Sequence, residues 1–525
     1  MQSIIKRVAF LNILILLLLT LAHAQQANPL VITIDTKDKA QVIQNIGVSG
    51  CWYSEPVGKY WPAEKKQRIA ELLFSKKMDN AGNPAGIGVS AFRFNVGAGT
   101  AETGIAGGIA DPTHRAECFL NADGSYDWHR QSGYQWFLQK AKAYGVENLL
   151  IFSNSPPVQF TLNGFGFKTK KDSLANLKPE NYSLYAGFLA TVIEHFDGQG
   201  LHFNYVSPVN EPQWDWTGKI GDAKQEGTPW TNREIYKVVQ SLDSALRSKK
   251  LKTRITVAEA GMLTYLYGEK TAASRQIQNF FSDTSSMSFT RLSMVPHLLV
   301  GHSYFTDSND SSLVAIRKRV ADTAKKYKVE FWQSEYCMLG NGYKGGLAGS
   351  RTPMDCALFL AKVIHNDLAV ANATAWHFWN AYEPGDAERE NRYYLIALKP
   401  DSGFVNGSFT ATKNLWSLGQ YSLFIRPGMQ RLNIKRSDHL NDTEAAQKTM
   451  ISAYINHENR IVVVAINYTN GPQTMKLDLQ NGHSMKSISS YVTTAARDDN
   501  MRFAPLQTLD ALVLPGRSIT TFVIE

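Results

Sequence analysis

Two stretches decide the fold of this 525-residue chain: Val206-Ser-Pro-Val-Asn-Glu-Pro-Gln-Trp-Asp-Trp216 and Val329-Glu-Phe-Trp-Gln-Ser-Glu-Tyr336. Each starts as an apolar, strand-like run and reaches a carboxylate, Glu211 or Glu335, with tryptophan close by. A single Glu in such a place is commonly a capping or salt-bridged residue at a strand-to-helix turn. Two of them, together with six other strand ends, favour an α/β barrel, because functional side chains collect at the C-terminal ends of barrel strands.

Strand-like and helical patterns alternate over most of the chain. The eight strand candidates are Ile46–Ser49, Val89–Asn95, Leu149–Asn154, Phe203–Asn210, Arg254–Glu259, Leu299–Tyr304, Val329–Glu335 and Ala373–Asn380. The helical patterns are Ala63–Lys77, Gln131–Tyr144, Leu184–Phe196, Asn232–Ser248, Ser312–Tyr327 and Pro353–Ala369, with Leu263–Phe281 less clear. Strands that alternate with helices indicate a parallel sheet, and eight repeats predict a closed (β/α)8 TIM barrel.

A doubly wound open sheet is the structural alternative. Such a sheet more naturally carries a glycine-rich phosphate turn after its first strand, and Gly47-Val-Ser-Gly50 lacks the required spacing. The helical spacing within Leu184–Phe196 places Leu184, Phe188, Leu189 and Val192 on one side of that helix.

The pattern of apolar and polar residues changes after about residue 415. Short runs there alternate apolar and polar residues: Thr449–Ile455, Arg460–Tyr468, Thr474–Leu479, Ile488–Val492 and Ser518–Ile524. This pattern is typical of an antiparallel β-sandwich, and Leu30–Asp35 alternates in the same way. We therefore expect residues 41–412 to form the barrel, and residues 25–40 with 413–525 to form a side β-sandwich built from both termini.

Composition and the N-terminus indicate an exported globular protein. Hydrophobic residues make up 44% of the chain. The net charge is +9, but the sequence has no run of five or more Lys/Arg, which argues against nucleic-acid binding. Residues 1–24 have the pattern of a signal peptide: Lys6 and Arg7, an apolar stretch, and the small-x-small site Ala22-His23-Ala24. The apolar stretch is shorter than the roughly 20 residues of a membrane-spanning helix. We expect cleavage near Ala24, a secreted or periplasmic location, and no membrane attachment afterwards.

The four cysteines are too few for a disulfide scaffold. They are Cys51, Cys118, Cys337 and Cys356. Export permits one or two disulfide bonds, and the sequence leaves their pairing open. Their spacing matches no zinc-binding pattern.

Polar and aromatic residues crowd the strand ends at one rim of the expected barrel. They are Trp52, Arg93, Asn95, Asn154, Asn210, Trp214, Trp216, His302, Tyr304 and Trp379, beside Glu211 and Glu335. Each alone has a structural explanation, since a strand-end Asn satisfies turn backbone and a lone His or Trp commonly packs in the core. Together they predict a sugar-sized pocket in which one carboxyl group protonates a glycosidic oxygen and the other attacks or stabilises the sugar carbon.

These motifs resemble glycoside hydrolase family 30, within the large clan of retaining (β/α)8 glycosidases. The resemblance rests on Asn210-Glu211-Pro212, on Glu335 three strands later, on Trp379, and on Gly419-Gln-Tyr-Ser-Leu-Phe-Ile-Arg-Pro-Gly428 between barrel and sandwich. Ser153-Asn-Ser-Pro-Pro157 and Asn210-Glu-Pro-Gln-Trp-Asp-Trp216 look most like its endo-β-1,6-galactanase-like branch. The xylanase branch usually has Trp where Asn154 stands. Pro157-Val-Gln-Phe160 departs from the branch pattern, in which a Trp or an aromatic-Met pair is usual.

The resemblance implies a role for each matching residue. Glu211 would be the general acid/base and Glu335 the nucleophile. Asn210 would bind the 2-hydroxyl of the reacting sugar, Tyr304 would hold Glu335, and Arg93 would keep that carboxylate ionised. Trp379 would form the floor beneath the sugar. No metal and no organic cofactor is implied, and we expect a monomer whose partner is an oligo- or polysaccharide.

Three functional alternatives remain at this stage. The first is a secreted retaining endo-glycanase, with β-1,6-galactan of arabinogalactan side chains as the expected substrate. The second is another β-glycanase or an exo-β-glycosidase of the same family, acting on xylan or β-1,6-glucan. The third is a glycan-binding protein that has lost catalysis, against which the presence of both Glu211 and Glu335 argues. The long segments Gly97–Arg130 and Gly340–Thr352 form either a cleft wall or a cap, and this choice separates endo from exo action.

Overall fold

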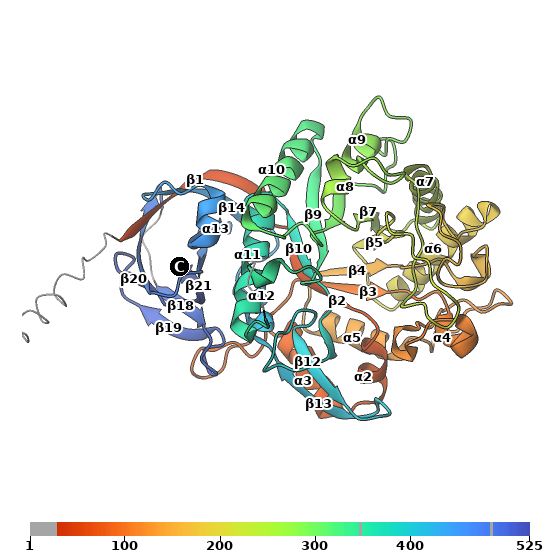
Figure 1. The fold of residues 1–525 in the computed structure, drawn as a ribbon, viewed down its shortest axis with the longest axis horizontal. Helices are drawn as coiled ribbons and strands as arrows, with labels where there is room; N and C mark the ends of the chain where they lie inside the picture. The colour runs from red at the N-terminus through yellow and green to blue at the C-terminus, as the bar shows by residue number, and fades with distance from the viewer. Residues whose placement is uncertain (1–28, 346–348, 483–486) are drawn as a thin grey trace, which may run out of the picture.

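A parallel barrel and a curled antiparallel sheet make up the protein (Figure 1). The computed structural model describes residues 29–345, 349–482 and 487–525. The expected signal peptide, residues 1–24, lies outside the described residues. In Figure 1 the barrel lies to the right and the curled sheet to the left, beside the C-terminus. The predicted fold class, a TIM barrel with an associated sandwich from both termini, is confirmed.

The barrel closes through a strand that is interrupted in the middle. Its strands are β2 (Asn45–Gly50), β3 (Ala91–Asn95), β4 (Asn148–Phe152), β5 (Tyr205–Ser207), β6 (Arg254–Ile255), β7 (Val257–Ala260), β8 (Leu298–His302), β9 (Glu330–Tyr336) and β10 (Ala375–Phe378). They pair in parallel in the order β6-β5-β4-β3-β2-β10-β9-β8-β7. Only Thr256 separates β6 from β7. These two are therefore the halves of one fifth strand, and the ladder is an eight-stranded barrel.

The helices surround the barrel largely as the sequence periodicity predicts. They are α2 (Ser54–Tyr60), α3 (Ala63–Phe74), α4 (Thr100–Thr103), α5 (Ser132–Ala143), α6 (Tyr182–Gly198), α7 (Asn232–Ser248), α8 (Thr264–Tyr267), α9 (Gln276–Phe281), α10 (Asp310–Tyr327) and α11 (Pro353–Ala369). Capping boxes, Thr231 with Glu234 and Thr352 with Asp355, start α7 and α11 at the predicted residues. The unclear helix Leu263–Phe281 is broken into α8 and α9.

The buried face of α6 differs from the expected one by one residue. Leu184 is 54% exposed, whereas Tyr185 is fully buried. The Tyr185 hydroxyl donates a hydrogen bond to the Pro208 carbonyl oxygen (2.7 Å) in the loop after β5. Because this polar tip reaches a backbone partner, a tyrosine occupies the inward position that apolar periodicity assigned to leucine.

The interior of the barrel is layered by the two-residue period of its strands. A separate apolar cluster of Ala91, Leu150, Leu298, Val300, Trp332 and Ala375 fills one layer. Two residues further along β3, β8 and β10 come Arg93, His302 and His377, all buried. Since alternate strand residues share a face, the interior changes from apolar to polar toward the C-terminal ends of the strands.

The second body is one curled sheet. Its strands are β1 (Leu30–Val42), β14 (Gln430–Arg436), β15 (Thr449–Ile455), β16 (Ile461–Asn467), β17 (Gln473–Gln480), β18 (Ile488–Thr493), β19 (Arg502–Leu506), β20 (Leu512–Leu514) and β21 (Ser518–Ile524), in the order β19-β18-β21-β16-β15-β14-β1-β17-β20. The N-terminal β1 pairs antiparallel with β14 and parallel with β17. At the end of the ladder β20 lies against β16 and β21, so the sheet folds over its own apolar core.

Helix α12 (Lys413–Ser422) joins the two bodies. It packs against α11 and β2 of the barrel and against β18 and β21 of the curled sheet. The Gln420 amide donates to the Thr493 hydroxyl (2.9 Å), and the Ser417 hydroxyl donates to the Ala357 carbonyl (2.7 Å). Because α12 belongs to both interfaces, a domain boundary near residue 412 stays a proposal. A small sheet precedes α12 in the chain and consists of β11 (Tyr382–Pro384), β12 (Ile396–Pro400) and β13 (Gly407–Ala411). The sequence predicted neither this sheet nor α13 (Asp442–Gln447).

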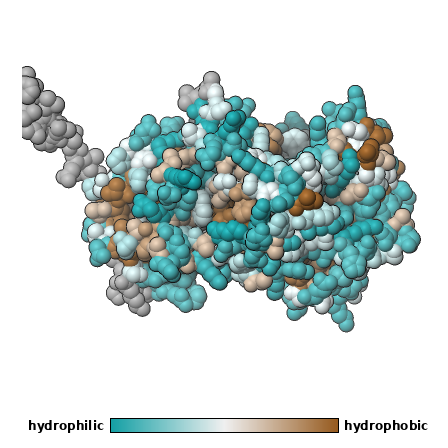
Figure 2. Space-filling model, turned by 90° about the horizontal axis from the view of Figure 1, so that it is seen from below, coloured by the Kyte–Doolittle hydropathy of each residue, from teal (hydrophilic) through white to brown (hydrophobic). Residues whose placement is uncertain are grey.

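The surface seen in Figure 2 is mainly polar, and the cysteines lie inside the protein, as is usual for a globular protein. The face in Figure 2 is mainly hydrophilic, with small separate hydrophobic areas. Among the described residues no helix has the length and apolar character needed to cross a membrane. All four cysteines are buried and free.

The pairing of β1 should be essential for the curled sheet. Ile32 is fully buried in its core, so Ile32→Ala should lower the free energy of unfolding by about 2–5 kcal/mol. The exposed Lys37 of the same strand offers a control, and Lys37→Ala should change it by less than about 0.5 kcal/mol. The measurement is the midpoint of denaturation for each variant. An unchanged midpoint in Ile32→Ala would contradict the assignment of β1 to this core.

Candidate active site

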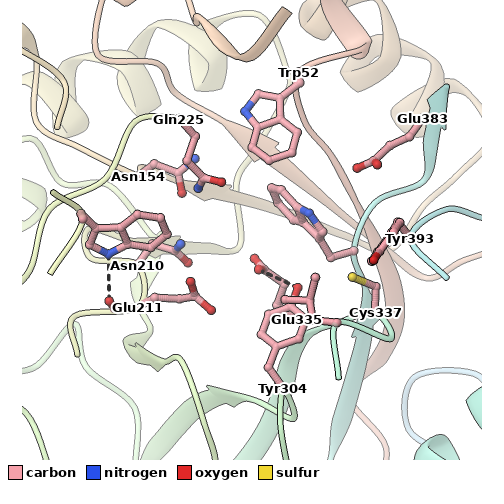
Figure 3. Close-up of a pocket in the computed structure, with 13 residues that line it drawn as sticks. Trp52, Asn154, Asn210, Glu211, Gln225, Tyr304, Glu335, Cys337, Glu383 and Tyr393 are labelled. Atoms are coloured by element: carbon pink, nitrogen blue, oxygen red, sulfur yellow. Dashed lines mark hydrogen bonds between the residues drawn. The ribbon is translucent and has the colours of Figure 1, made fainter. Parts of the chain in front are cut away.

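A pocket of about 190 Å³ opens at the C-terminal ends of the barrel strands (Figure 3). Its lining contains eight of the predicted site residues, Trp52, Asn154, Asn210, Glu211, Trp216, Tyr304, Glu335 and Trp379. Five further residues line it as well: Gln225, Cys337, Leu339, Glu383 and Tyr393. The volume is below the roughly 300–1,000 Å³ of pockets for drug-sized ligands, so the pocket encloses a small group such as one sugar ring.

Two carboxyl groups face each other inside the pocket. One oxygen of Glu211 and one of Glu335 lie within 4.8 Å of each other. The Arg93 guanidinium donates a hydrogen bond to Glu335 Oε2 (2.9 Å), and the Tyr304 hydroxyl donates to Oε1 (3.0 Å). Both oxygens of Glu335 are thus held in place, and a permanent cation lies against them. Such an arrangement fixes the orientation of the Glu335 carboxylate.

The position of Glu335 depends on an irregularity in β9. Gly301 of β8 pairs with Gln333, but the next residue, His302, pairs with Glu335, so Ser334 is an extra residue in the ladder. Ser334 contacts Glu259, and Glu335 contacts Arg93. Consecutive strand residues normally point to opposite faces, and a bulge of this kind re-aims one of them. Both side chains therefore reach the barrel interior.

Glu211 is held by its own backbone in an unusual conformation. Its φ angle of 42° lies in the left-handed region, which is uncommon outside glycine. The Glu211 amide donates to the Glu259 carbonyl (2.9 Å), and its carbonyl accepts from the Trp216 indole (3.0 Å). Trp216 and Glu259 also have positive φ angles, 48° and 49°. Strain of this kind persists where surrounding contacts enforce it and is concentrated at functional sites.

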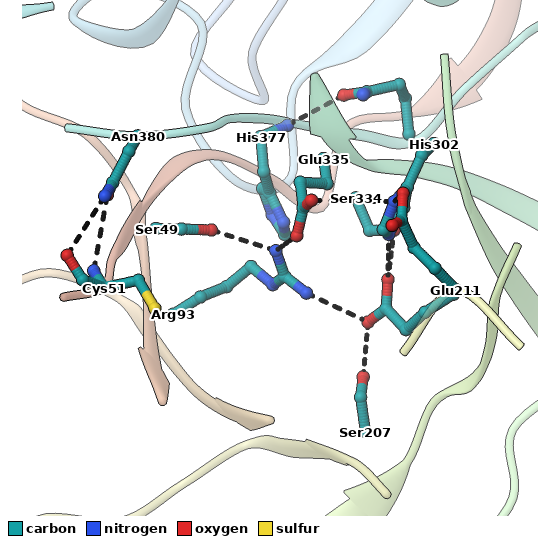
Figure 4. A network of polar contacts seen from close by, with 12 residues as sticks. Ser49, Cys51, Arg93, Ser207, Glu211, His302, Ser334, Glu335, His377 and Asn380 are labelled. Carbon is teal, nitrogen blue, oxygen red and sulfur yellow. Dashed lines mark hydrogen bonds and ion pairs between the residues drawn. The ribbon is translucent and has the colours of Figure 1, made fainter. Parts of the chain in front are cut away.

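The buried His302 connects Glu211 with Glu259, which lies in β7 (Figure 4). His302 Nδ1 lies 2.9 Å from Glu211 Oε1, and its Nε2 lies 3.1 Å from Glu259 Oε2. Glu259 also accepts hydrogen bonds from Ser207 and Ser334 (2.5 Å each). Glu259 ends the fifth strand, so the sequence did place it at this rim, although it was not among the predicted site residues. Its role is to position His302 rather than to line the pocket.

The protonation states follow from burial and charge. Burial lowers the pKa of His302, but the nearby Glu335, Glu211 and Glu259 outweigh it and raise this pKa to about 10. Burial raises the pKa of Glu259, and the Arg93 and His302 cations reverse this and hold it well below its ordinary value. For Glu211, burial dominates and the pKa is raised. The surroundings of Glu211 therefore favour its protonated form more than water does.

The same cluster contains the candidate metal ligands in the described part of the chain. One atom each of Glu211, His302 and Glu335 lie within 4.8 Å of one another. Both ring nitrogens of His302 face carboxylates, however, and its raised pKa keeps both protonated at neutral pH. A protonated imidazole has no lone pair for a metal. The donor set therefore fits a proton-transfer site better than a metal site.

The remaining predicted residues occupy different places. Trp379 and Trp52 meet edge to face (5.2 Å between ring centroids) in the pocket wall, and Asn210 Oδ1 is buried without a hydrogen-bond partner. An unpartnered buried acceptor in a pocket indicates a position for a ligand hydroxyl. Asn95 and Trp214 do not line this pocket: Asn95 is buried elsewhere, and Trp214 packs on Tyr265 and Phe305.

Comparison with known proteins decides the family. The model of O-glycosyl hydrolase family 30 matches residues 29–390, well over half of the chain. The chain belongs to glycoside hydrolase family 30. It is therefore a glycosidase, as the sequence motifs predicted.

The family 30 chain is similar to enzymes with different substrates. It is 24% identical over 476 residues to an endo-β-1,6-galactanase of Hypocrea rufa, covering 88% of this chain and 86% of that one. It is 23% identical over 410 residues to a glucuronoxylanase of Bacillus subtilis, covering 76% and 78%. A solved structure described as a conserved exported protein from Bacteroides fragilis is 35% identical with a TM-score of 0.87, covering 94% of this chain and all of that chain.

The protonated His302 should make the stability of this family 30 enzyme depend on pH. A pKa raised from 6.5 to about 10 stabilises the fold fully below pH 6.5, and this contribution is lost as the pH rises through about 10. In His302→Gln the unfolding midpoint should therefore fall less between pH 7 and 10 than in the wild type. His377 is the matched control, because burial lowers its pKa to about 3 and it is neutral throughout. His377→Gln should keep the wild-type pH slope; a wild-type slope in His302→Gln would contradict the assigned charge.

Proposed function

We propose that this protein is a secreted, retaining endo-β-1,6-galactanase that acts on β-1,6-galactan such as arabinogalactan side chains. The observation that carries the retaining mechanism is the separation of the two carboxyl groups, with oxygens of Glu211 and Glu335 within 4.8 Å. Retaining glycosidases hold their carboxyl groups about 5–5.5 Å apart, whereas inverting ones need about 6.5–9.5 Å to admit a water molecule. The oxygen separation here is shorter than the inverting range.

Glu335 acts as the nucleophile in this proposal. Its carboxylate attacks C1 of the sugar and forms a covalent glycosyl-enzyme while the leaving oxygen departs. The Arg93 guanidinium and the Tyr304 hydroxyl each donate to one oxygen of Glu335 and so fix its orientation. Arg93 itself lies over the Phe152 ring (4.3 Å) and bonds to the Ser49 hydroxyl (2.9 Å), so it is held firmly beneath the pocket.

Glu211 acts as the acid and then as the base. Burial raises its pKa, so it carries a proton that it transfers to the leaving oxygen. Once Glu211 is ionised, the His302 imidazolium at 2.9 Å stabilises the new negative charge. In the second step Glu211 removes a proton from water, which attacks C1 and releases the sugar. His302 thus acts through Glu211 as a positioning residue.

The sugar whose C1 reacts lies in the pocket between these groups. Trp379 provides an apolar floor, and the unpartnered Asn210 Oδ1 accepts from the 2-hydroxyl. Asn154, where xylanases of the family usually have Trp, adds a polar group to the same wall. Trp216 lies on the leaving-group side, beside Glu211, and offers an aromatic face to the next sugar.

The choice of galactan rests on two independent features. One is the sequence motif formed by Asn154 and Gln213-Trp214-Asp215-Trp216, which resembles the galactanase branch. The other is the Hypocrea rufa galactanase, whose similarity extends over most of both chains. The similarity to a glucuronoxylanase favours xylan as the second candidate. Secretion rests on residues 1–24 and on the exported relative from Bacteroides fragilis, and the enzyme acts as a monomer in this proposal.

The two carboxyl groups should fail differently when truncated. Glu335→Ala should lose nearly all turnover, because no covalent intermediate forms. Glu211→Ala should keep turnover on 2,4-dinitrophenyl glycosides, whose departure needs no proton, and added azide should raise it further. The azide product should be the β-glycosyl azide, identified by NMR. An α-glycosyl azide would disprove retention, and wild-type activity in Glu335→Ala would disprove the assigned nucleophile.

The substrate proposal is tested with three polysaccharides. The purified enzyme should release galactobiose and longer products from β-1,6-galactan faster than it cuts xylan or β-1,6-glucan. Product profiles over time are measured by chromatography, with Glu335→Ala as the inactive control. A higher rate on xylan or β-1,6-glucan would overturn the galactanase proposal, and release of galactose or galactobiose alone from chain ends would overturn endo action.

A further inference from the structure

Glu383 is a third carboxyl group in the pocket that the mechanism does not use. It lies in β11, just past the eighth barrel strand, and its side chain lines the pocket with Trp52, Trp379 and Tyr393. Figure 3 shows Glu211 and Glu383 on opposite sides, with Glu335 between them. Since the leaving group departs toward Glu211, Glu383 meets the far edge of the bound sugar.

No cation in the described part of the chain forms an ion pair with Glu383. The amide of Asn380 is its one polar neighbour that lowers the pKa, and that amide also donates to the Cys51 carbonyl (3.0 Å). Burial dominates and raises the pKa of Glu383 to about 8. By contrast, Glu335 and Glu259 both form ion pairs with Arg93. A poorly paired carboxyl group on a pocket wall is costly unless a ligand completes its hydrogen bonds.

The sugar hydroxyl that reaches this position follows from ring geometry. In a pyranose ring C4 lies opposite C1, and C1 must face Glu335. Asn210 is on the Glu211 side and meets the 2-hydroxyl, so the far edge carries the substituents at C4 and C5. The aromatic walls formed by Trp52 and Trp379 confine the ring between these two ends.

We propose that Glu383 binds the 4-hydroxyl of the sugar whose C1 reacts, and thereby selects chains in which that hydroxyl is free. This inference rests on the proposed function and names its specificity determinant. In a 1,6-linked chain the 4-hydroxyl of every residue is free. In a 1,4-linked chain such as xylan, O4 is the bridge to the preceding sugar and has no proton to donate. A neutral carboxyl group both donates and accepts, so Glu383 satisfies such a hydroxyl completely.

The test measures coupling between the side chain and the hydroxyl. The substrates are 2,4-dinitrophenyl β-D-galactoside, the corresponding β-D-glucoside and the single 4-deoxy analogue that the two share, because galactose and glucose differ only at C4. The value of kcat/KM is determined for wild type, Glu383→Ala and Glu383→Gln. On the hydroxylated substrate that the wild type prefers, Glu383→Ala should lose about 10- to 100-fold, as for a hydrogen bond to a polar group in a dry site. On the matching 4-deoxy substrate the loss should be about twofold or less. Glu383→Gln keeps the shape and part of the bonding and should lie between.

Controls separate this inference from misfolding and from the proposed function. Glu388 is exposed on the same loop and outside the pocket, so Glu388→Gln should match the wild type. Equal losses on the preferred hydroxylated substrate and on the 4-deoxy substrate, or no loss, in Glu383→Ala and Glu383→Gln would overturn the role of Glu383. A wild type that prefers the glucoside would instead overturn the choice of galactose, while the coupling is still measured between the glucoside and the shared 4-deoxy substrate.

Discussion

The two ion pairs of the buried Arg93 are the interaction on which the rest of the site depends. Its guanidinium lies between Glu335 (2.9 Å) and Glu259 (3.4 Å) at the centre of the barrel, where it is about 1% exposed. A charge in such a place is tolerated only when partners surround it. Removing any member would leave an uncompensated buried charge, so the cluster constrains five side chains at once.

The charge balance of this cluster bears on the proton affinity of Glu211, which has an oxygen within 4.8 Å of one oxygen of Glu335. Arg93 and His302 supply two positive charges, and Glu259 and Glu335 use both. For Glu211, burial is the largest influence and raises the pKa against the opposing effect of His302. In the proposed mechanism this raised pKa suits Glu211 to the role of the acid.

The barrel gives this cluster its geometry. An apolar layer around Ala91 and Trp332 fills the interior below, and the two-residue strand period puts Arg93 and His302 in the layer above it. The bulge at Ser334 then turns Glu335 inward beside its neighbour. Loops with left-handed residues, Glu211 among them, carry the chain across the rim. The curled sheet is joined to the barrel through α12, and no described residue of that sheet lines the pocket.

The sequence by itself determined the barrel, the strand ends and the pair Glu211 and Glu335, because hydrophobic period and motif spacing are local properties of the chain. It also placed Asn210, Tyr304 and Trp379 at the pocket, through their matches to the family motif. Only the tertiary structure decided that Ser334 is a bulge, that His302 bridges Glu211 and Glu259, and that Glu383 enters the pocket while Asn95 and Trp214 do not. These features depend on strand register and on charges brought together from distant parts of the chain, and neither leaves a periodic signal in the sequence. The same reason explains α6, where one hydrogen bond to Pro208 turned Tyr185 inward in place of Leu184.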